Sequence, residues 1–347
     1  MDLLIVGAGA VGSTYGYLAS RGGAKVTYLI KPKHRADLQN GAQLYWWQGR
    51  KAESVVFRDF DLVDDPKSLR SRKFDAVLIT LPSDKFRADD WLATFLADFD
   101  VGSPDAKIWS LQPAANDQAF LQEKLGDAAF DARVVKGKIP ILGYLAPLPG
   151  EAFERTGHAF YVPPGAKAAW SSKNEAAAKE AARLFDSGGL ASKAVDGAPK
   201  ASALVPEAIL RGIVAGLERS EWSFDRLLNG ENLHLATGAM REMMDIGAKH
   251  QKTADPSAKW WVRFATSPPG VKALVRLARK IIPFDFEAFM RVHFTKVDGQ
   301  MHLNLDEQIE FAKRNGIPTT NLVLLRGRRK PSSSEKSPTT SPTSPSR

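Results

Sequence analysis

The hydrophobic pattern differs between the two halves of the chain. In the first half short apolar runs alternate with amphipathic segments, which predicts strands alternating with helices. The turn Gln48-Gly49-Arg50 between residues 43–47 and 54–58 predicts a hairpin. Buried parallel strands are almost continuously apolar, as residues 74–82 are, so we expect an α/β domain. The expected strands are 3–6, 25–30, 74–82, 107–112, 133–140 and 159–162, and the expected helices are 10–20, 91–99 and 117–125.

A Gly-x-Gly-x-x-Gly turn follows the first apolar run directly. It consists of Gly7, Gly9 and Gly12, with Ala10 and Val11 before the last glycine. In such a turn the first glycine permits a tight bend, the second lets the backbone approach a pyrophosphate, and the third lets the helix pack on the sheet. Free N–H groups at the start of the helix favour an anion. A strand before this turn and a helix after it predict a Rossmann-type dinucleotide site, so we assign these five residues to a cofactor.

The segment after the second strand bears on the choice of cofactor. An acidic residue there binds the ribose 2′-hydroxyl of NAD, whereas basic residues accommodate the 2′-phosphate of NADP. Lys31, Lys33 and Arg35 occupy this segment, and no carboxylate follows before Asp37. We therefore expect NADPH rather than NADH as the cofactor.

Two further strand ends are expected beside the same cofactor. In an open α/β sheet, ligands bind at the carboxyl ends of the strands. The strand over residues 74–82 ends at Leu81 and Pro82, and the strand over residues 107–112 ends at Gln112. We assign Leu81, Pro82 and Gln112 to the cofactor site.

The pattern becomes helical beyond residue 170. Ser172 and Glu175 have the spacing of a capping box, and helices are predicted over residues 176–185 and through 200–250. We therefore expect a Rossmann-type domain over residues 1–170 and a helical substrate and dimerisation domain over residues 171–325. Residues 326–347 are mostly Lys, Arg, Ser, Thr and Pro, which predicts a disordered basic tail.

Composition narrows the function mainly by exclusion. The chain has 347 residues and no Cys, so disulfides, thiolate metal sites and Cys nucleophiles are excluded. Its six His residues lack metal-ligand spacing, and we expect no metal. No apolar run approaches the ~20 residues that span a bilayer. The net charge is +9, but six basic residues and one acidic residue lie beyond residue 325. The charge of residues 1–325 is therefore too small to indicate nucleic-acid binding. We expect a cytoplasmic protein of ordinary enzyme size.

Several of these features together resemble the ketopantoate reductase family. They are residues 4–12, the basic turn, the hairpin, the strand end Ile79-Thr80-Leu81, the helical second half and the closing stretch 311–319. The likeness covers residues 1–325. It implies a Rossmann-type domain followed by an all-helical domain of the 6-phosphogluconate dehydrogenase C-terminal type. It also implies a homodimer and the reduction of a 2-keto acid by NADPH.

The chain departs from that family at its catalytic positions. The resemblance implies a Lys that protonates the carbonyl, nearby Asn residues and a Glu at the start of the last long helix. Here the Asn-Gly pair falls at residues 112–113, which are Gln-Pro, and the Lys position falls at Leu204 or Val205. Lys200 lies about four residues too early. The cofactor therefore carries over, but pantoate formation does not. Two interpretations stay open, a reductase with a rewired site for another carbonyl substrate and an NADPH-binding scaffold without turnover.

One polar cluster stands where the family places its Glu. Lys296 is suited to protonate an alkoxide, and Asp298 or Gln300 to orient a hydroxyl or carbonyl. We take these three as candidate catalytic residues; the alternative is an ordinary loop with a turn at Asp298 and Gly299. A second polar pair, Glu207 and Arg211, has i, i+4 spacing and is interpreted as a helix-stabilising ion pair.

Residues 271–282 have one apolar and one basic face, and Trp260 and Trp261 precede them. Most such helices pack their apolar face on a domain core. A membrane surface and a pocket for a bulky apolar substrate remain the alternatives, and neither is favoured.

Overall fold

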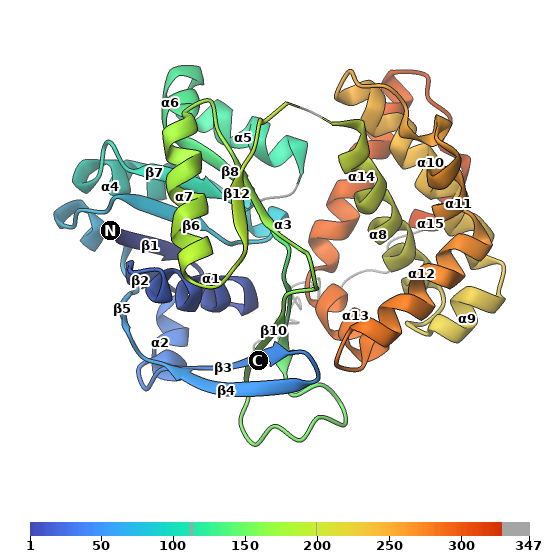
Figure 1. Cartoon of the computed structure of the whole chain (residues 1–347). Helices are drawn as coiled ribbons and strands as arrows, with labels where there is room; N and C mark the ends of the chain where they lie inside the picture. Colours follow the sequence, from blue (N-terminus) through green and yellow to red (C-terminus); the bar gives the residue numbers. More distant parts are fainter. Residues whose placement is uncertain (112–113, 199, 328–347) are drawn as a thin grey trace, which may run out of the picture.

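An eight-stranded sheet forms the framework of the first half of the chain (Figure 1). The structure is a computed structural model and describes residues 1–111, 114–198 and 200–327. The strand order is β12-β11-β8-β7-β6-β1-β2-β5. The six adjacent strands β8, β7, β6, β1, β2 and β5 are parallel, whereas β11 is antiparallel to β8. The strands are β1 (Asp2–Val6), β2 (Lys25–Leu29), β5 (Phe60–Val63), β6 (Ala76–Ile79), β7 (Lys107–Ser110), β8 (Val134–Lys138), β11 (Ala168–Ser171) and β12 (Ser192–Ala194).

Helices cover both faces of this sheet because the side chains of its strands alternate between two cores. In β1, Leu3 and Ile5 belong to one core, whereas Leu4 and Val6 belong to the other. The first core is closed by α1 (Ala10–Arg21) and α7 (Glu175–Ser187). The elements around the second core are η2 (Pro66–Ser71), α3 (Ser83–Phe86), α4 (Trp91–Gly102), α5 (Ala115–Leu125) and α6 (Asp127–Arg133). The expected α/β fold class is confirmed.

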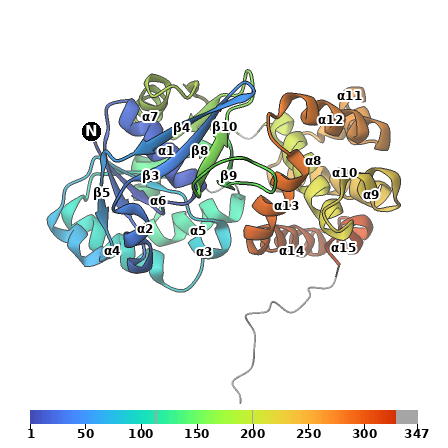
Figure 2. The ribbon, with the colours of Figure 1, turned by 90° about the horizontal axis from the view of Figure 1, so that it is seen from below.

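A smaller sheet lies between α1 and the helical half (Figure 2). Its order is β4-β3-β10-β9, formed by β3 (Ala42–Gln48), β4 (Lys51–Phe57), β9 (Leu142–Ala146) and β10 (Gly157–Tyr161). The predicted hairpin is β3–β4, closed at Gly49 and Arg50 with Gly49 at φ +61°. The strand expected at residues 159–162 joins this sheet as β10 rather than continuing the large one. Tyr144 and Tyr161 of this sheet pack against Phe284 of the helical half.

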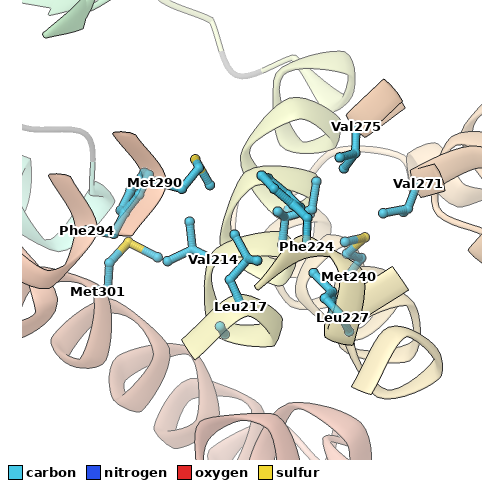
Figure 3. Packing of buried hydrophobic residues seen from close by; sticks show 14 of the residues in the cluster. Val214, Leu217, Phe224, Leu227, Met240, Val271, Val275, Met290, Phe294 and Met301 are labelled. Carbon is cyan, nitrogen blue, oxygen red and sulfur yellow. The ribbon is translucent and has the colours of Figure 1, made fainter. Parts of the chain in front are cut away.

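The second half of the chain is a helical bundle with its own core (Figure 3). Close packing of α8 on α10 requires small residues, because a Cβ on Gly212 would lie 2.5 Å from Met240 Cγ. Figure 3 shows Met240 beside Leu227, with Val271 and Val275 approaching from a further helix. The helices are α8 (Ala201–Arg219), α9 (Phe224–Asn229), α10 (Asn232–His250), η3 (Pro256–Ala258), α11 (Trp260–Ala265), α12 (Pro268–Ile281), α13 (Phe286–Lys296), α14 (Asp298–Arg314) and α15 (Thr320–Arg326).

The large sheet takes up more of the chain than the sequence indicated. The expected boundary at residue 170 divides elements that share one sheet and one core, because β12 pairs with β11 and Phe185 of α7 stacks on Trp170. The apolar face of the helix over residues 176–185 thus packs on the large sheet and not in the helical half. The expected capping box is absent; Asn174 caps α7 by accepting from the Ala177 N–H at 3.2 Å, and the Ser172 hydroxyl donates to the Val134 carbonyl.

The end of the described chain also differs from expectation. Arg326 closes α15 and donates two hydrogen bonds to Asp306, at 2.7 and 2.8 Å, so it is not part of a tail. Residues 328–347, the rest of the predicted disordered tail, lie outside the described residues. Within the described ranges, no helix combines the length and apolar character needed to cross a bilayer.

Candidate functional site

The turn between β1 and α1 is built by its glycines. Gly7 adopts φ +95°, and its N–H donates to the Leu29 carbonyl at 3.0 Å. A Cβ on Gly12 would lie 2.0 Å from the Gly7 carbonyl oxygen, so only glycine fits there. Gly9 differs from both, since a Cβ placed on it meets nothing within 4 Å. Two of the glycines therefore serve the turn itself, and Gly9 faces open space.

The first turn of α1 leaves backbone donors free. Gly9 caps the helix without a side-chain hydrogen bond, and Ser13 is the first residue whose N–H is bonded along the helix, to the Gly9 carbonyl at 2.8 Å. Among the described residues, no group accepts from the N–H groups of Ala10, Val11 or Gly12. These donors and the helix dipole favour an anion, so the turn has the features of a pyrophosphate cradle.

The basic turn after β2 divides into two kinds of residue. It comprises η1 (Pro32–His34) and α2 (Arg35–Leu38). Lys31 and Lys33 are exposed, and neither has an ion-pair partner among the described residues. Arg35 instead donates to both oxygens of Asp64, at 2.6 and 3.2 Å, and this hydrogen bonding lowers the pKa of Asp64. Arg35 is thus engaged by the residue after β5, which leaves the two lysines as the available cations.

The strand end after β6 lies on the glycine turn. Leu81 Cδ2 is 3.2 Å from the position that a Cβ on Gly7 would take, and the Thr80 hydroxyl donates to the Val6 carbonyl at 2.8 Å. Pro82 is the N-cap of α3. Gln112 lies outside the described residues. Leu81 and Pro82 therefore stand at the edge of the sheet where the cradle opens.

A polar clasp joins this edge to the helical half. Asp117 is fully buried; it accepts from the Ser83 hydroxyl at 2.6 Å and pairs with Arg87 Nε at 2.8 Å. Burial raises the pKa of Asp117, and the Ser83 and Arg87 contacts oppose that rise. Arg87 also pairs with Glu307 of α14, and the Ser83 N–H donates to the Gln300 side chain at 2.9 Å. Both contacts tie α14 to the segment after β6.

The three candidate catalytic residues do not come together. Gln300 belongs to the clasp, because its side-chain oxygen accepts from Ser83. Lys296 and Asp298 are exposed, and the carboxylate of Asp298 accepts from the next N–H, that of Gly299, at 2.6 Å. Instead of a single loop, they stand at the end of α13 and the start of α14.

A pocket of about 310 Å³ opens between the two halves of the molecule. The ion pair interpreted from the sequence lies on its wall, with Arg211 Nη2 2.5 Å from Glu207 Oε1. Arg211 is buried, and Glu207 is its only ion-pair partner among the described residues. The wall is formed by Ala114 and Asn116 near the start of α5, Leu204, Glu207, Ala208 and Arg211 of α8, Met243, Ile246, Gly247 and His250 of α10 with the adjacent Gln251, and Asn304, Glu307, Gln308, Phe311 and Arg314 of α14.

The polar groups of the pocket suit a small anionic ligand that also carries hydrogen-bond donors. Arg211 supplies N–H donors. The side-chain oxygens of Asn304 and Gln308 are buried without a partner among the described residues, which is costly unless a ligand or a water molecule donates to them. The i, i+4 spacing revealed the ion pair, but nothing local in the sequence identified Asn304 or Gln308, because the packing of α14 on α8 and α10 brings them there.

Two imidazoles lie at the smaller sheet, His158 on β10 and His293 on α13. His293 Nδ1 is 2.9 Å from the carbonyl oxygen of Gly143, whose own Cβ position is 3.6 Å from Ala10 Cβ. Burial lowers the pKa of His293 and that of His158, the latter to about 4, and the charge of Lys296 acts in the same direction. No cluster of three or more metal-binding side chains occurs in the part of the chain that is described.

Comparison with solved structures finds this architecture in known enzymes. A D-mandelate dehydrogenase with NADH and anilino(oxo)acetate is 14% identical, with a TM-score of 0.64 over 94% of this chain and 96% of that one. The chain has the fold of the ketopantoate reductases. One from Ralstonia eutropha JMP134 is 16% identical, with a TM-score of 0.65 over 94% and 96% of the two chains. A 2-dehydropantoate 2-reductase from Geobacter metallireducens GS-15 is 17% identical, with a TM-score of 0.61 over 94% and 98%. No protein-family model matches the chain, and no curated protein matches it by sequence.

The buried imidazole of His158 predicts an acid-sensitive fold. Its pKa of about 4 lies below the 6.5 of an exposed histidine, so below pH 6.5 the unfolded chain binds a proton that the folded chain refuses. The stability that depends on the neutral form of His158 is fully present above pH 6.5. As the pH falls to 5, protonation of the unfolded chain lowers the free energy of unfolding by about 2 kcal/mol. Urea unfolding at several pH values should show a shallower acid loss in His158→Asn than in the unmodified protein. The exposed His34→Asn is the control; equal slopes in all three proteins would contradict the prediction.

Proposed function

We propose that the protein is an NADPH-dependent reductase of a small carbonyl compound that carries an anionic group. One observation carries the proposal: the open pyrophosphate cradle and the polar pocket share one edge of the sheet. In an open α/β sheet a dinucleotide lies along the carboxyl ends of the strands. A cofactor whose pyrophosphate lies on α1 extends from β1 toward β7, and the pocket begins at Ala114 and Asn116, just beyond β7.

The choice of NADPH rests on the basic turn. Lys31 and Lys33 are exposed directly after β2, where the ribose 2′-position lies in this class of fold. Arg35, which the sequence also suggested, is already bound to Asp64 and contributes by holding the turn. The D-mandelate dehydrogenase of similar fold was solved with NADH and anilino(oxo)acetate, which supports a nicotinamide-dependent reaction on an oxo acid. The preference for NADPH over NADH rests on Lys31 and Lys33 alone.

The residues of the pocket supply the remaining chemistry. NADPH, when bound, provides a hydride for the carbonyl carbon. Arg211 is placed to pair with the anionic group of the substrate, and Glu207 keeps its guanidinium in position. The alkoxide that forms needs a proton, and His250 of the lining is a side chain that can donate one. Asn304 and Gln308 accept hydrogen bonds from the substrate. Lys296 and Asp298 have no part in this scheme.

The cofactor assignment predicts a selective loss of affinity. The double variant Lys31→Ala/Lys33→Ala should bind NADPH about tenfold more weakly, or worse, because two charges near the 2′-phosphate are removed, and NADH binding should not change. Fluorescence titration of both nucleotides measures this effect. Lys193→Ala removes an equally exposed lysine far along the sheet, on β12, and is the control. An equal loss for both nucleotides would refute the role of the basic turn, and no binding of either would refute the enzyme.

The substrate assignment predicts that substitutions of Arg211 and His250 change different kinetic parameters. With a panel of 2-keto acids that begins with ketopantoate, Arg211→Lys should raise KM about tenfold or more, because the planar fork is lost while the charge remains. His250→Gln should lower kcat, because the proposed proton donor is removed. Arg219→Lys on the same helix, outside the pocket, is the control. An unchanged KM in Arg211→Lys would contradict the assignment. NADPH binding without oxidation by any acid tested would favour the non-catalytic interpretation.

A further inference from the structure

A helical hairpin at the outer end of the bundle exposes an unusual amount of apolar surface. Figures 1 and 2 show α11 and α12 on the side of the helical half that is remote from the large sheet. Trp260 is 79% exposed, Phe264 54% and Leu277 53%. Trp261, Leu274 and Ile281 are exposed as well. The proposed reductase site uses none of these side chains.

The apolar surface of α12 is wider than the core requires. Val271, Val275 and Ile282 are buried and hold the helix on the bundle. A second strip, Leu274, Leu277 and Ile281, has spacings of three, four and seven residues, so its members lie on one side of the helix. That strip faces solvent. Packing on the domain core, the interpretation that the sequence favours, therefore accounts for only part of the apolar face of α12.

The charge around this surface has a single sign. Residues 256–284 contain six basic residues and no acidic one. Arg279 is partly engaged, at 3.5 Å from Glu287 and over the Phe224 ring. Lys259, Arg263, Arg276 and Lys280 are exposed. The hairpin thus presents aromatic and aliphatic side chains beside a field of positive charge.

A hollow beside the hairpin gathers two arginines. It is lined by Arg241 and Arg263, with Ser257, Ala258 and Thr266. Arg241 donates to the Thr266 carbonyl at 3.3 Å, which holds its guanidinium at the hollow. Guanidinium groups and a serine hydroxyl are the donors that bind phosphate oxygens.

Charge and apolarity together select among the occupants of this surface. A second copy docked through a two-fold axis would bring the same positive patch against itself. A nucleic acid would match the charge, but it leaves the strip of Leu274, Leu277 and Ile281 without a partner. An anionic membrane surface satisfies both, because Trp, Leu and Ile side chains enter the boundary of the acyl chains while Lys and Arg meet the headgroups.

We propose that the α11–α12 hairpin docks the protein on membranes that contain anionic phospholipids, with a headgroup phosphate at the hollow of Arg241 and Arg263. The helices lie on the surface and do not cross it. Because the hairpin is remote from the large sheet, docking leaves the cradle and the pocket free, and this inference does not depend on the proposed reductase activity.

Co-sedimentation with vesicles tests the proposal. We expect the full chain to pellet with vesicles of phosphatidylcholine and phosphatidylglycerol in equal parts at least fivefold more than with phosphatidylcholine alone, and less at high salt. Trp260→Ala/Phe264→Ala and Arg263→Glu/Arg276→Glu should each lose most of this binding. Val323→Ala/Leu324→Ala, which truncates two side chains of α15 that are 48% and 56% exposed, is the matched control and should bind normally. Circular dichroism confirms that each variant is folded.

Two results would overturn the proposal. One is no preference for the anionic vesicles, or a preference that survives in both hairpin variants. The other is a dimer in sedimentation velocity that Trp260→Ala/Phe264→Ala converts to a monomer, because the hairpin would then be a contact between copies of this chain. A Trp fluorescence spectrum that shifts to shorter wavelength on adding anionic vesicles, and does so less in Trp260→Ala/Phe264→Ala, supports insertion at the membrane boundary.

Discussion

The close approach of Gly12 to the carbonyl of Gly7 is the contact on which the rest of the site depends. Because a Cβ at Gly12 would lie 2.0 Å from that oxygen, the first helix rests directly on the end of β1. The free N–H groups of Ala10, Val11 and Gly12 therefore lie beside the end of β1, and nothing at Gly9 blocks the approach of a ligand. Leu81 completes the contact from the neighbouring strand. A tight backbone turn, and no charged side chain, thereby leaves donors that favour an anion.

The position of the helical half relative to this cradle depends on the polar clasp. Arg87 joins the buried Asp117 to Glu307, and Gln300 accepts from the backbone of Ser83. Buried ion pairs contribute little net stability, because desolvation offsets much of their attraction, but removing one partner strands the other charge. We therefore interpret the clasp as a device for alignment. It holds α14 beside the carboxyl ends of the strands, and Asn304 and Gln308 on that helix then form one wall of the pocket that Arg211 faces.

The sequence predicted the parts of the molecule that are local. Gly7 to Gly12, the hairpin and the strands β1, β2, β6, β7 and β8 could be recognised because each depends on its own residues and spacing. β12 has three residues and α7 has a helical pattern that does not say what it packs against, so the extent of the large sheet was missed. The site divided in the same way. Lys31 and Lys33 were proposed from their distance to the glycines, whereas Asn304 and Gln308 come to the pocket only when α14 meets α8 and α10. The pairing of Arg35 with Asp64 could not be predicted, because Asp64 is far away in sequence.

We propose that the cradle and the pocket serve one bound dinucleotide and its substrate. Hydrogen exchange followed by mass spectrometry, with and without NADPH, tests this arrangement. We expect slower exchange in peptides that contain residues 9–13, with a further slowing along residues 114–120 and 204–211, where the cofactor would reach the pocket. No change at residues 9–13, or protection confined to the helical half, would contradict it.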